Sequence, residues 1–451
     1  MTLPELLERY GKAPIPRYTS YPPANLWGDV QGDEFAKRFF ARVERPLALY
    51  VHVPFCHKLC FYCGCNMLVT RNQDLVTRYL KAIDVEMARV AALVKKGQKV
   101  VQLHLGGGTP TFLDDAQLVQ LIGSVQKYFP FQKGVEASIE VHPPVTTLKQ
   151  IETLESLGFN RISMGVQDFD PKVQERVNRI QSFEQTRDLV VHARQHGFES
   201  VNMDLMYGLP LQTIEGFTRT LELITQVKPD RLALFGYAHM PARIKHQRVL
   251  NGDIPAPDLR LALLELGIER LLEAGYVYIG LDHFALPSDE LVKARAAHTM
   301  HRNFMGYATG AETDMLAFGP SSISELHGAY AQNLHEVHAW AKAVEEGHVP
   351  IGKGFEPSDE DHLRREVIME LFCHLEVDLE RYAKRYGRDW HSAFGPELEQ
   401  LKPLERDGLC SRSGALVKLT DVGQRFVRTV AAVFDATLTQ KVGQRHHAAA
   451  V

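Results

Sequence analysis

Four cysteines lie within the short segment 50–65, which reads YVHVPFCHKLCFYCGC. Cys56, Cys60 and Cys63 have the spacing C-x3-C-x2-C, and Cys65 follows two residues later. Thiolates are soft ligands, and several of them on one loop can enclose a metal ion or an iron–sulfur cluster. Tetrahedral zinc usually takes its ligands from two separate pairs, and the sequence has no second pair of closely spaced cysteines. The pattern therefore favours a [4Fe–4S] cluster with one iron open to a further ligand, and a zinc site is the alternative.

The cysteines follow an apolar run, 47–53, that is typical of a buried strand. Strand-like and helix-like segments alternate after it. The expected strands are 47–53, 100–105, 136–141, 161–166, 200–206 and 231–236, and the expected helices are 73–96, 114–128, 147–157, 183–196 and 214–226. Six such repeats predict an α/β fold with a parallel sheet and right-handed crossovers. The pattern alone does not decide whether that sheet closes into a barrel.

Composition narrows the class of protein. The chain has 451 residues, which is enough for two or three domains, and its 45% hydrophobic and 24% charged residues are ordinary for a globular protein. A formal net charge of −4 gives no indication of nucleic-acid binding. No apolar run approaches the roughly 18 residues that a membrane span needs, and the first residues carry charges where a secretion signal would be apolar. We therefore expect a cytoplasmic protein with reduced thiols and with no nucleic-acid or membrane partner.

At the cysteines the sequence resembles the radical S-adenosylmethionine (SAM) enzymes, whose signature is C-x3-C-x2-C with an aromatic residue, here Tyr62, before the third cysteine. The longer phrase HVPFCHKLCFYCGCN and the segment PRYTSYPPA at 16–24 are similar to one branch, the oxygen-independent coproporphyrinogen III oxidases. The resemblance runs from this segment to the last expected helix. It implies a partial (β/α)6 TIM-like barrel of the radical SAM type, with an N-terminal extension and a mostly helical C-terminal domain. In such folds the chemistry takes place at the carboxyl ends of the strands.

The chain is expected to have three parts. Residues 1–35 would form an extension that covers the substrate, residues 36–350 the radical SAM catalytic domain, and residues 351–451 the mostly helical C-terminal domain. In the last part, helices are expected at 359–372, 379–386, 396–406 and 421–434, with a small strand at 416–419.

The resemblance implies that Cys56, Cys60 and Cys63 hold one [4Fe–4S] cluster, while Cys65 is not expected to be a ligand. It also implies that two SAM molecules bind. The contacts transferred to the first SAM are Tyr50, Gly107, Glu140 and Ile323, and those transferred to the second are Tyr62, Gly108, Thr109, Gln167, Arg179, Asp204 and Ala238.

Without the resemblance, the residue types alone give weaker evidence for these contacts. A run of three glycines lets backbone approach a ligand, although it is more often a tight turn. A polar group such as Gln167 or Asp204 that interrupts a buried strand needs a partner, which indicates a site.

Three positions bear on ligand recognition. Arg17 is a candidate partner for a substrate propionate because a guanidinium matches a carboxylate, and a solvated loop arginine is the equally open alternative. Met305 and His142 depart from the family pattern, which has glutamine and aspartate there. That glutamine is expected to touch the second SAM, so Met305 bears on how this molecule would bind, although its polarizable sulfur can pack against an adenine or a sulfonium.

The reaction implied by the resemblance is the oxidative decarboxylation of coproporphyrinogen III to protoporphyrinogen IX in haem biosynthesis. A 5′-deoxyadenosyl radical removes a hydrogen atom from each of two propionates, and loss of CO2 and one electron leaves a vinyl group. An electron donor such as flavodoxin or ferredoxin and a monomeric state are implied as well.

The alternatives are a haem-binding radical SAM chaperone, another haem-handling radical SAM protein, and a zinc-stabilised structural protein. The chaperones lack the PRYTSYP segment and a cysteine at the position of Cys65, and this chain has both.

Overall fold

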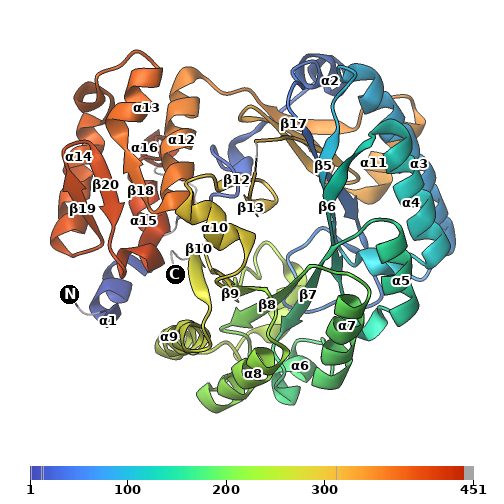
Figure 1. Ribbon diagram of the computed structural model, residues 1–451, viewed down its shortest axis with the longest axis horizontal. Helices are drawn as coiled ribbons and strands as arrows, with labels where there is room; N and C mark the ends of the chain where they lie inside the picture. The colour runs from blue at the N-terminus through green and yellow to red at the C-terminus, as the bar shows by residue number, and fades with distance from the viewer. Residues whose placement is uncertain (2, 12, 14, 311, 441–451) are drawn as a thin grey trace.

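The computed structural model describes residues 1, 3–11, 13, 15–310 and 312–440. Within these residues a 13-stranded sheet curves through the larger part of the molecule (Figure 1), in the order β1-β17-β16-β15-β14-β2-β5-β6-β7-β8-β9-β11-β10. Because β1 and β10 are its two edges, the sheet stays open and forms a partial barrel, as expected.

The six predicted strands and five predicted helices are all present. The strands are β2 (Leu47–Val53), β5 (Val100–Gly107), β6 (Phe131–Val141), β7 (Arg161–Gln167), β8 (Ser200–Tyr207) and β9 (Arg231–Gly236), each parallel to the next. The helices are α3 (Gln73–Leu93), α4 (Asp115–Tyr128), α5 (Leu148–Ser156), α7 (Phe183–Gln195) and α8 (Ile214–Val227). Each helix begins after a residue whose side chain accepts a hydrogen bond from its first turn, namely Asn72, Asp114, Thr147, Ser182 and Thr213. These caps satisfy backbone N–H groups that lack partners within the helix.

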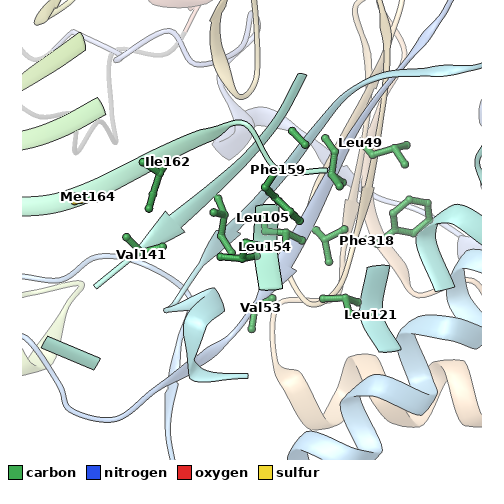
Figure 2. Close-up of a cluster of buried hydrophobic side chains, with 14 of the residues drawn as sticks. Leu49, Val53, Leu105, Leu121, Val141, Leu154, Phe159, Ile162, Met164 and Phe318 are labelled. Atoms are coloured by element: carbon green, nitrogen blue, oxygen red, sulfur yellow. The ribbon is translucent and has the colours of Figure 1, made fainter. Parts of the chain in front are cut away.

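Side chains alternate between the two faces of the strands. The apolar residues of each strand face outward and pack on the helices, and Figure 2 shows Leu49, Leu105 and Phe318 in one buried cluster with Leu121 of α4 and Leu154 of α5. Burying one such side chain contributes about 1.5–3 kcal/mol to stability. Alternation with a period of two then points the intervening residues into the barrel. The inward residues are polar: Tyr50 and His52 on β2, His104 on β5, Ser138 and Glu140 on β6, Ser163 on β7, and Asn202 and Asp204 on β8.

The sheet extends beyond the predicted barrel on both sides. On one side β14 (Asp314–Phe318) is parallel to β2, and β15 (Ile323–Leu326), β16 (Ala329–Asn333), β17 (Ile351–Phe355) and β1 (Gly28–Asp29) follow as antiparallel strands. On the other side β11 (His283–Ala285) and β10 (Val277–Gly280) continue from β9. In this extension β1, near the start of the chain, pairs with β17, which ends at residue 355.

Shorter elements complete this larger part. They are α2 (Gly32–Phe40), β3 (Phe55–Cys56), β4 (Leu68–Val69), α6 (Pro171–Arg176), the 3-10 segment η5 (Lys245–Leu250), α9 (Pro257–Glu273), α10 (Glu290–Ala296), β12 (His301–Asn303), β13 (Gly306–Ala308) and α11 (Val337–Glu345).

The C-terminal part has its own core. Its helices are α12 (Asp359–His374), α13 (Leu379–Arg385), α14 (Trp390–Arg406), α15 (Val427–Ala432) and the short α16 (Thr437–Gln440). Its sheet has the order β18 (Glu376–Asp378), β20 (Leu416–Leu419), β19 (Cys410–Ser413). The helix expected at 421–434 is instead a 3-10 turn, η6 (Gly423–Phe426), followed by the short α15. Leu6 of α1 (Leu3–Leu6), Tyr18 and Tyr21 belong to the same apolar cluster, so the N-terminal segment packs on this part (Figure 1). No helix among the described residues has the length and apolar character needed to cross a membrane.

Candidate active site

The cysteine loop leaves the barrel at the carboxyl end of β2. The register pairs Val53 of β2 with Gly107 of β5, so the loop after β2 and the glycine-rich turn after β5 emerge side by side. Cys56, Cys60 and Cys63 are all free thiols. The predicted ligands therefore lie at the mouth of the barrel.

Each of the three sulfur atoms contacts a polar group, two of them from other segments and one from the cysteine loop itself. Cys56 Sγ lies 3.5 Å from the Thr109 hydroxyl, Cys60 Sγ accepts from Arg179 Nη1 at 3.6 Å, and Cys63 Sγ accepts from the Cys65 amide at 3.4 Å. A hydrogen bond with the Cys65 thiol, assisted by the Cys65 amide, lowers the pKa of Cys63 to about 6, although burial acts in the opposite direction. Donors aimed at sulfur stabilise the thiolate, which is the form that binds metal.

Hydrogen bonds from two other segments hold the loop in place. The contacts are Phe61 N to Val177 O (2.9 Å), Asn178 Nδ2 to Leu59 O (2.8 Å), His246 Nε2 with Cys63 O (2.7 Å), and Gln247 Nε2 to Tyr62 O (2.9 Å). His246 and Gln247 had no sequence signal as site residues, because the segment KHQRVL shows neither a motif nor an unusual spacing.

The glycine-rich turn fits closely against this loop. A Cβ atom on Gly108 would lie 2.7 Å from the Phe55 carbonyl oxygen and 3.1 Å from Cys56 Sγ. Gly107 has φ of +116°, and a Cβ there would lie 2.7 Å from the ring of His52. Both positions therefore require glycine, and the backbone of the turn is brought next to the cysteine sulfurs.

The spacing of the sulfurs fits an iron–sulfur cluster better than zinc. Sulfur ligands of one tetrahedral zinc ion lie about 3.8 Å apart, given a Zn–S distance of about 2.3 Å. Among the described residues, the groups of three or more Cys, His, Asp or Glu whose ligand atoms all lie within 4.8 Å of one another do not include these cysteines. At least one pair of these sulfurs therefore lies farther apart than one zinc ion allows, and three thiols on one loop suit the larger [4Fe–4S] cluster.

The four residues predicted for the first SAM line a single cavity. Tyr50, Gly107, Glu140 and Ile323 line a space of about 330 Å³ at the mouth of the barrel, and Cys65 lies in the same wall. Sequence reasoning did not place Cys65 there.

Glu140 is the acidic group of this cavity. Its carboxylate accepts from the Gly107 amide at 3.1 Å and lies 3.4 Å from His104 Nε2. Burial by itself would raise the pKa of Glu140, but His104 and the Gly107 amide lower the pKa below its ordinary value. The cavity therefore presents an ionised carboxylate to a bound molecule.

A buried glutamate of α3 fixes the turn between β14 and β15, which leads to Ile323. Glu86 accepts from the Gly319 amide (3.0 Å), the Asn333 amide (2.6 Å) and the Trp340 indole (3.1 Å). Burial raises the pKa of Glu86 to about 7, against the effect of these hydrogen bonds. The turn after β14, the end of β16 and helix α11 are thus joined at one point behind the first cavity.

The residues predicted for the second SAM are distributed around the cysteine loop. Thr109 and Gly108 lie at Cys56, and Arg179 lies between Cys60 and the Gly165 carbonyl, to which Nε donates at 3.2 Å. Gln167 has a φ of +69° at the end of β7. Tyr62 and Ala238 accept from the same side-chain amide, that of Gln247.

Asp204 lies in a cavity of about 290 Å³ inside the barrel, together with His104 and Glu140. Asn202 donates to its carboxylate at 2.9 Å. Burial raises the pKa of Asp204 to about 7, and the neighbouring Glu140 charge adds to this effect. The residues predicted for the second SAM are therefore not gathered in one cavity, unlike those predicted for the first SAM.

Two departures from the family pattern have distinct surroundings. Met305 lines the first cavity, together with Tyr50 and Cys65, and also the barrel interior, together with Asp204, so it lies near residues of both predicted SAM sets. His142 is partly buried, its Nε2 has no hydrogen-bond partner among the described residues, and burial and the Arg179 charge lower its pKa to about 3. A neutral imidazole with an unpaired nitrogen is suited to accept a hydrogen bond from a bound molecule.

Comparison with known proteins agrees with this geometry. The family model described as the radical SAM superfamily matches residues 50–224, and the HemN C-terminal domain matches residues 358–426. The oxygen-independent coproporphyrinogen III oxidase of Escherichia coli (strain K12) is 42% identical over 438 residues, covering 97% of this chain and 95% of that protein. The chain belongs to the oxygen-independent coproporphyrinogen III oxidase family. The oxygen-independent coproporphyrinogen III oxidase of Synechocystis sp. (strain ATCC 27184 / PCC 6803 / Kazusa) is 41% identical over 455 residues. The match covers 99% of this chain and 97% of that protein.

A solved structure of the same oxidase family has the same fold. Coproporphyrinogen III oxidase (HemN) from Escherichia coli, described as a radical SAM enzyme, superimposes with a TM-score of 0.91 and 41% identity. The match covers 93% of this chain and 97% of that one. The predicted fold class and family are therefore confirmed.

Proposed function

We propose that this protein converts two propionate side chains of coproporphyrinogen III to vinyl groups without oxygen, giving protoporphyrinogen IX in haem biosynthesis. The observation that carries the proposal is the identity of about 40% with oxygen-independent coproporphyrinogen III oxidases along nearly the whole chain. The three free thiols at the mouth of a radical SAM barrel support it.

Cys56, Cys60 and Cys63 would hold one [4Fe–4S] cluster, with Cys65 outside the ligand set. A cluster bound there together with SAM would supply the electron and the 5′-deoxyadenosyl radical that this reaction requires. The chain's own part is to bind and orient the reactants and to exclude water.

The first cavity would bind one SAM through Tyr50, Gly107, Glu140 and Ile323. Its ionised Glu140 carboxylate can accept hydrogen bonds from ribose hydroxyls and attracts a cationic ligand. The backbone of Gly107 lies close enough to the cysteine loop to bind the polar end of the same molecule.

A second SAM would contact Tyr62, Gly108, Thr109, Gln167, Arg179, Asp204 and Ala238. Arg179 is the fixed cation of this set, because the Gly165 carbonyl and Cys60 hold it in place. The unpaired nitrogen of His142 is close to the Arg179 charge and adds an acceptor to the same surroundings.

In the reaction each propionate loses one hydrogen atom, one CO2 and one electron, and the electron must leave for an acceptor. We further propose a cytoplasmic monomer reduced by a donor such as flavodoxin or ferredoxin, with no nucleic-acid or membrane partner, since clustered free thiols suit a reducing compartment.

We also propose the three-part organisation of an N-terminal extension over the substrate, a catalytic domain and a helical C-terminal domain. The pairing of β17 with β16 and β1 favours a C-terminal boundary after residue 355 instead of 350.

The test is anaerobic incubation of the reconstituted protein with coproporphyrinogen III, SAM and a reductant, followed by mass spectrometry of the tetrapyrroles after oxidation. Protoporphyrin is the expected product. Tight binding of added haem with no decarboxylated product would instead identify a haem chaperone.

A further inference from the structure

Four arginines from separate parts of the chain meet in one cavity of about 240 Å³ at the carboxyl end of β9. Arg17 comes from the N-terminal segment, Arg260 from α9, Arg425 from η6 and Arg428 from α15. The cavity therefore exists only when the N-terminal segment, the barrel and the C-terminal part are folded together.

Backbone carbonyl groups hold the arginine side chains in place. Arg17 Nη2 donates to Gly236 O at 3.2 Å, Arg260 Nη2 to Tyr237 O at 2.8 Å, and Arg428 Nη2 to Ile15 O at 2.9 Å. A carbonyl orients a guanidinium but does not neutralise its charge. Of the described residues that line the cavity, Asp282 is the one acidic side chain, so the cavity carries an excess of positive charge.

The pKa shifts of Arg428 and Asp282 agree with this excess of positive charge. Burial lowers the pKa of Arg428, the Asp282 charge acts in the opposite direction, and the Arg17 charge lowers the pKa further. Burial raises the pKa of Asp282, although Arg428 and Arg17 act in the opposite direction. An added anion would relieve the repulsion among the arginines.

A second arginine-rich cavity shows the contrast. It has about 440 Å³ and lies between β12 and α12, and four of its five arginines have carboxylate partners, whereas Arg302 has none among the described residues. Arg45 pairs with Glu312 at 2.8 Å, Arg385 pairs with Glu366 at 3.0 Å, and Arg365 pairs with Glu325. Four glutamates face five arginines in this lining, so this cavity has a smaller excess of positive charge than the first, where one aspartate faces four arginines.

The cavity with excess charge lies next to the cysteine loop. Its wall includes Ala238, whose carbonyl accepts from Gln247 Nε2 at 3.3 Å, and the same amide donates to Tyr62 O at 2.9 Å. Tyr62 directly precedes Cys63. A ligand in the cavity is therefore one backbone segment away from the loop that carries the cysteines.

Size and lining restrict what can bind. Cavities that enclose a whole drug-sized ligand have about 300–1,000 Å³, so a space of about 240 Å³ accepts only the edge of a large one. Leu264, Ile268 and Phe284 line it together with the arginines. Such a mixture suits an apolar ring that bears carboxylate side chains.

We propose that this cavity binds a propionate carboxylate of the tetrapyrrole substrate, at an edge remote from the propionate that reacts. The inference rests on the proposed function, because that function supplies a substrate with several carboxylates. The methionine carboxylate of a SAM molecule has the same chemistry, and the experiment below distinguishes the two sources. A single amino-acid carboxylate requires fewer than four arginines, which favours the substrate.

The test uses Arg260→Gln, Arg425→Gln and the double variant in the reconstituted full-length enzyme. Each single substitution removes a charge-assisted contact and is expected to raise the KM for coproporphyrinogen III about tenfold, and the double variant more. The KM for SAM, the iron content and SAM cleavage without substrate should stay as in the wild type. Arg260→Lys should restore part of the affinity. Arg385→Gln, in the ion-paired cavity, is the matched control and should leave the KM for coproporphyrinogen III unchanged.

Two outcomes would overturn the proposal. One is an unchanged KM for coproporphyrinogen III in the double variant, and the other is a raised KM for SAM alone, which would assign the cavity to the SAM carboxylate. Direct titration with coproporphyrin III, followed by fluorescence, separates this inference from the proposed function. If the wild type binds coproporphyrin III but forms no protoporphyrin, the proposed function fails, and weaker binding by the double variant would still support the cavity.

Discussion

Gln247 donates its side-chain amide to the carbonyl oxygen of Tyr62 at 2.9 Å, across a separation of 185 residues. The same amide reaches the carbonyl of Ala238 at 3.3 Å, and the Gln247 side-chain oxygen accepts from the Met240 amide at 2.6 Å. One buried side chain therefore fixes the cysteine loop to the segment that follows β9. The geometry of the cysteines and that of the arginine cavity depend on this residue together.

Replacing Gln247 with leucine should loosen both regions. Gln247 is 1% exposed, so the three backbone groups would lose their partners in a buried place. The expected loss is about 2–4 kcal/mol of stability, since an unsatisfied buried group costs about 1–3 kcal/mol. We expect a lower melting temperature and faster loss of iron to a chelator. Gln226→Leu on the exposed face of α8 is the matched control, and equal iron-loss rates in the two variants would contradict this role.

Substitution of the cysteines should separate ligands from neighbours. Cys56→Ala, Cys60→Ala and Cys63→Ala are each expected to abolish cluster binding and activity, because each removes one ligand sulfur. Cys65→Ala should keep the cluster. Iron and sulfide per chain after anaerobic reconstitution measure this directly, with Cys410→Ala in the C-terminal core as control. Loss of iron from Cys65→Ala would contradict the three-ligand assignment.

Arg179 should raise the reduction potential of the bound cluster. Its Nη1 lies 3.6 Å from Cys60 Sγ, and a cation at this distance favours the more negative, reduced state. Arg179→Gln is therefore expected to lower the midpoint potential by an amount on the order of tens of millivolts. A redox titration followed by electron paramagnetic resonance measures the shift. Arg176→Gln, which removes an ion pair with Asp253 on the neighbouring turn, should leave the potential unchanged.

SAM binding should depend on pH through Asp204. Burial raises the pKa of this carboxyl to about 7, so its ionised fraction rises from about a tenth at pH 6 to about nine-tenths at pH 8. The ionised form attracts the cationic sulfonium, and the Kd for SAM should therefore fall about tenfold as the pH rises from 6 to 8. Asp204→Asn stays neutral and should lose this dependence. An identical pH profile in the two proteins would show that Asp204 does not face SAM.

The parallel barrel could be predicted from sequence because its signals are local. Each of the six strands is an apolar run, and the first five are each followed by a capped amphipathic helix. The predicted strand starts agree with the structure except for β6, which begins earlier, at Phe131. Strands β14 to β17 escaped prediction because they are four or five residues long and no long amphipathic helix marks their spacing.

The candidate site was only partly predictable for a related reason. The cysteine spacing and the glycine turn are local motifs, whereas Gln247 and Arg260 act through contacts with segments that are distant or carry no motif. An arginine in sequence gives no sign of whether a carbonyl or a carboxylate will hold it. Only the folded chain distinguishes the cavity around Arg260 from the ion-paired cavity around Arg385.

The most direct test of the account is the stoichiometry of anaerobic turnover. The reconstituted protein would be given coproporphyrinogen III, SAM and a reductant, and protoporphyrin and 5′-deoxyadenosine would be counted in the same samples. Two propionates react in turn, so the account predicts about two molecules of 5′-deoxyadenosine for each protoporphyrin. Formation of 5′-deoxyadenosine without protoporphyrin, or of protoporphyrin without 5′-deoxyadenosine, would contradict it.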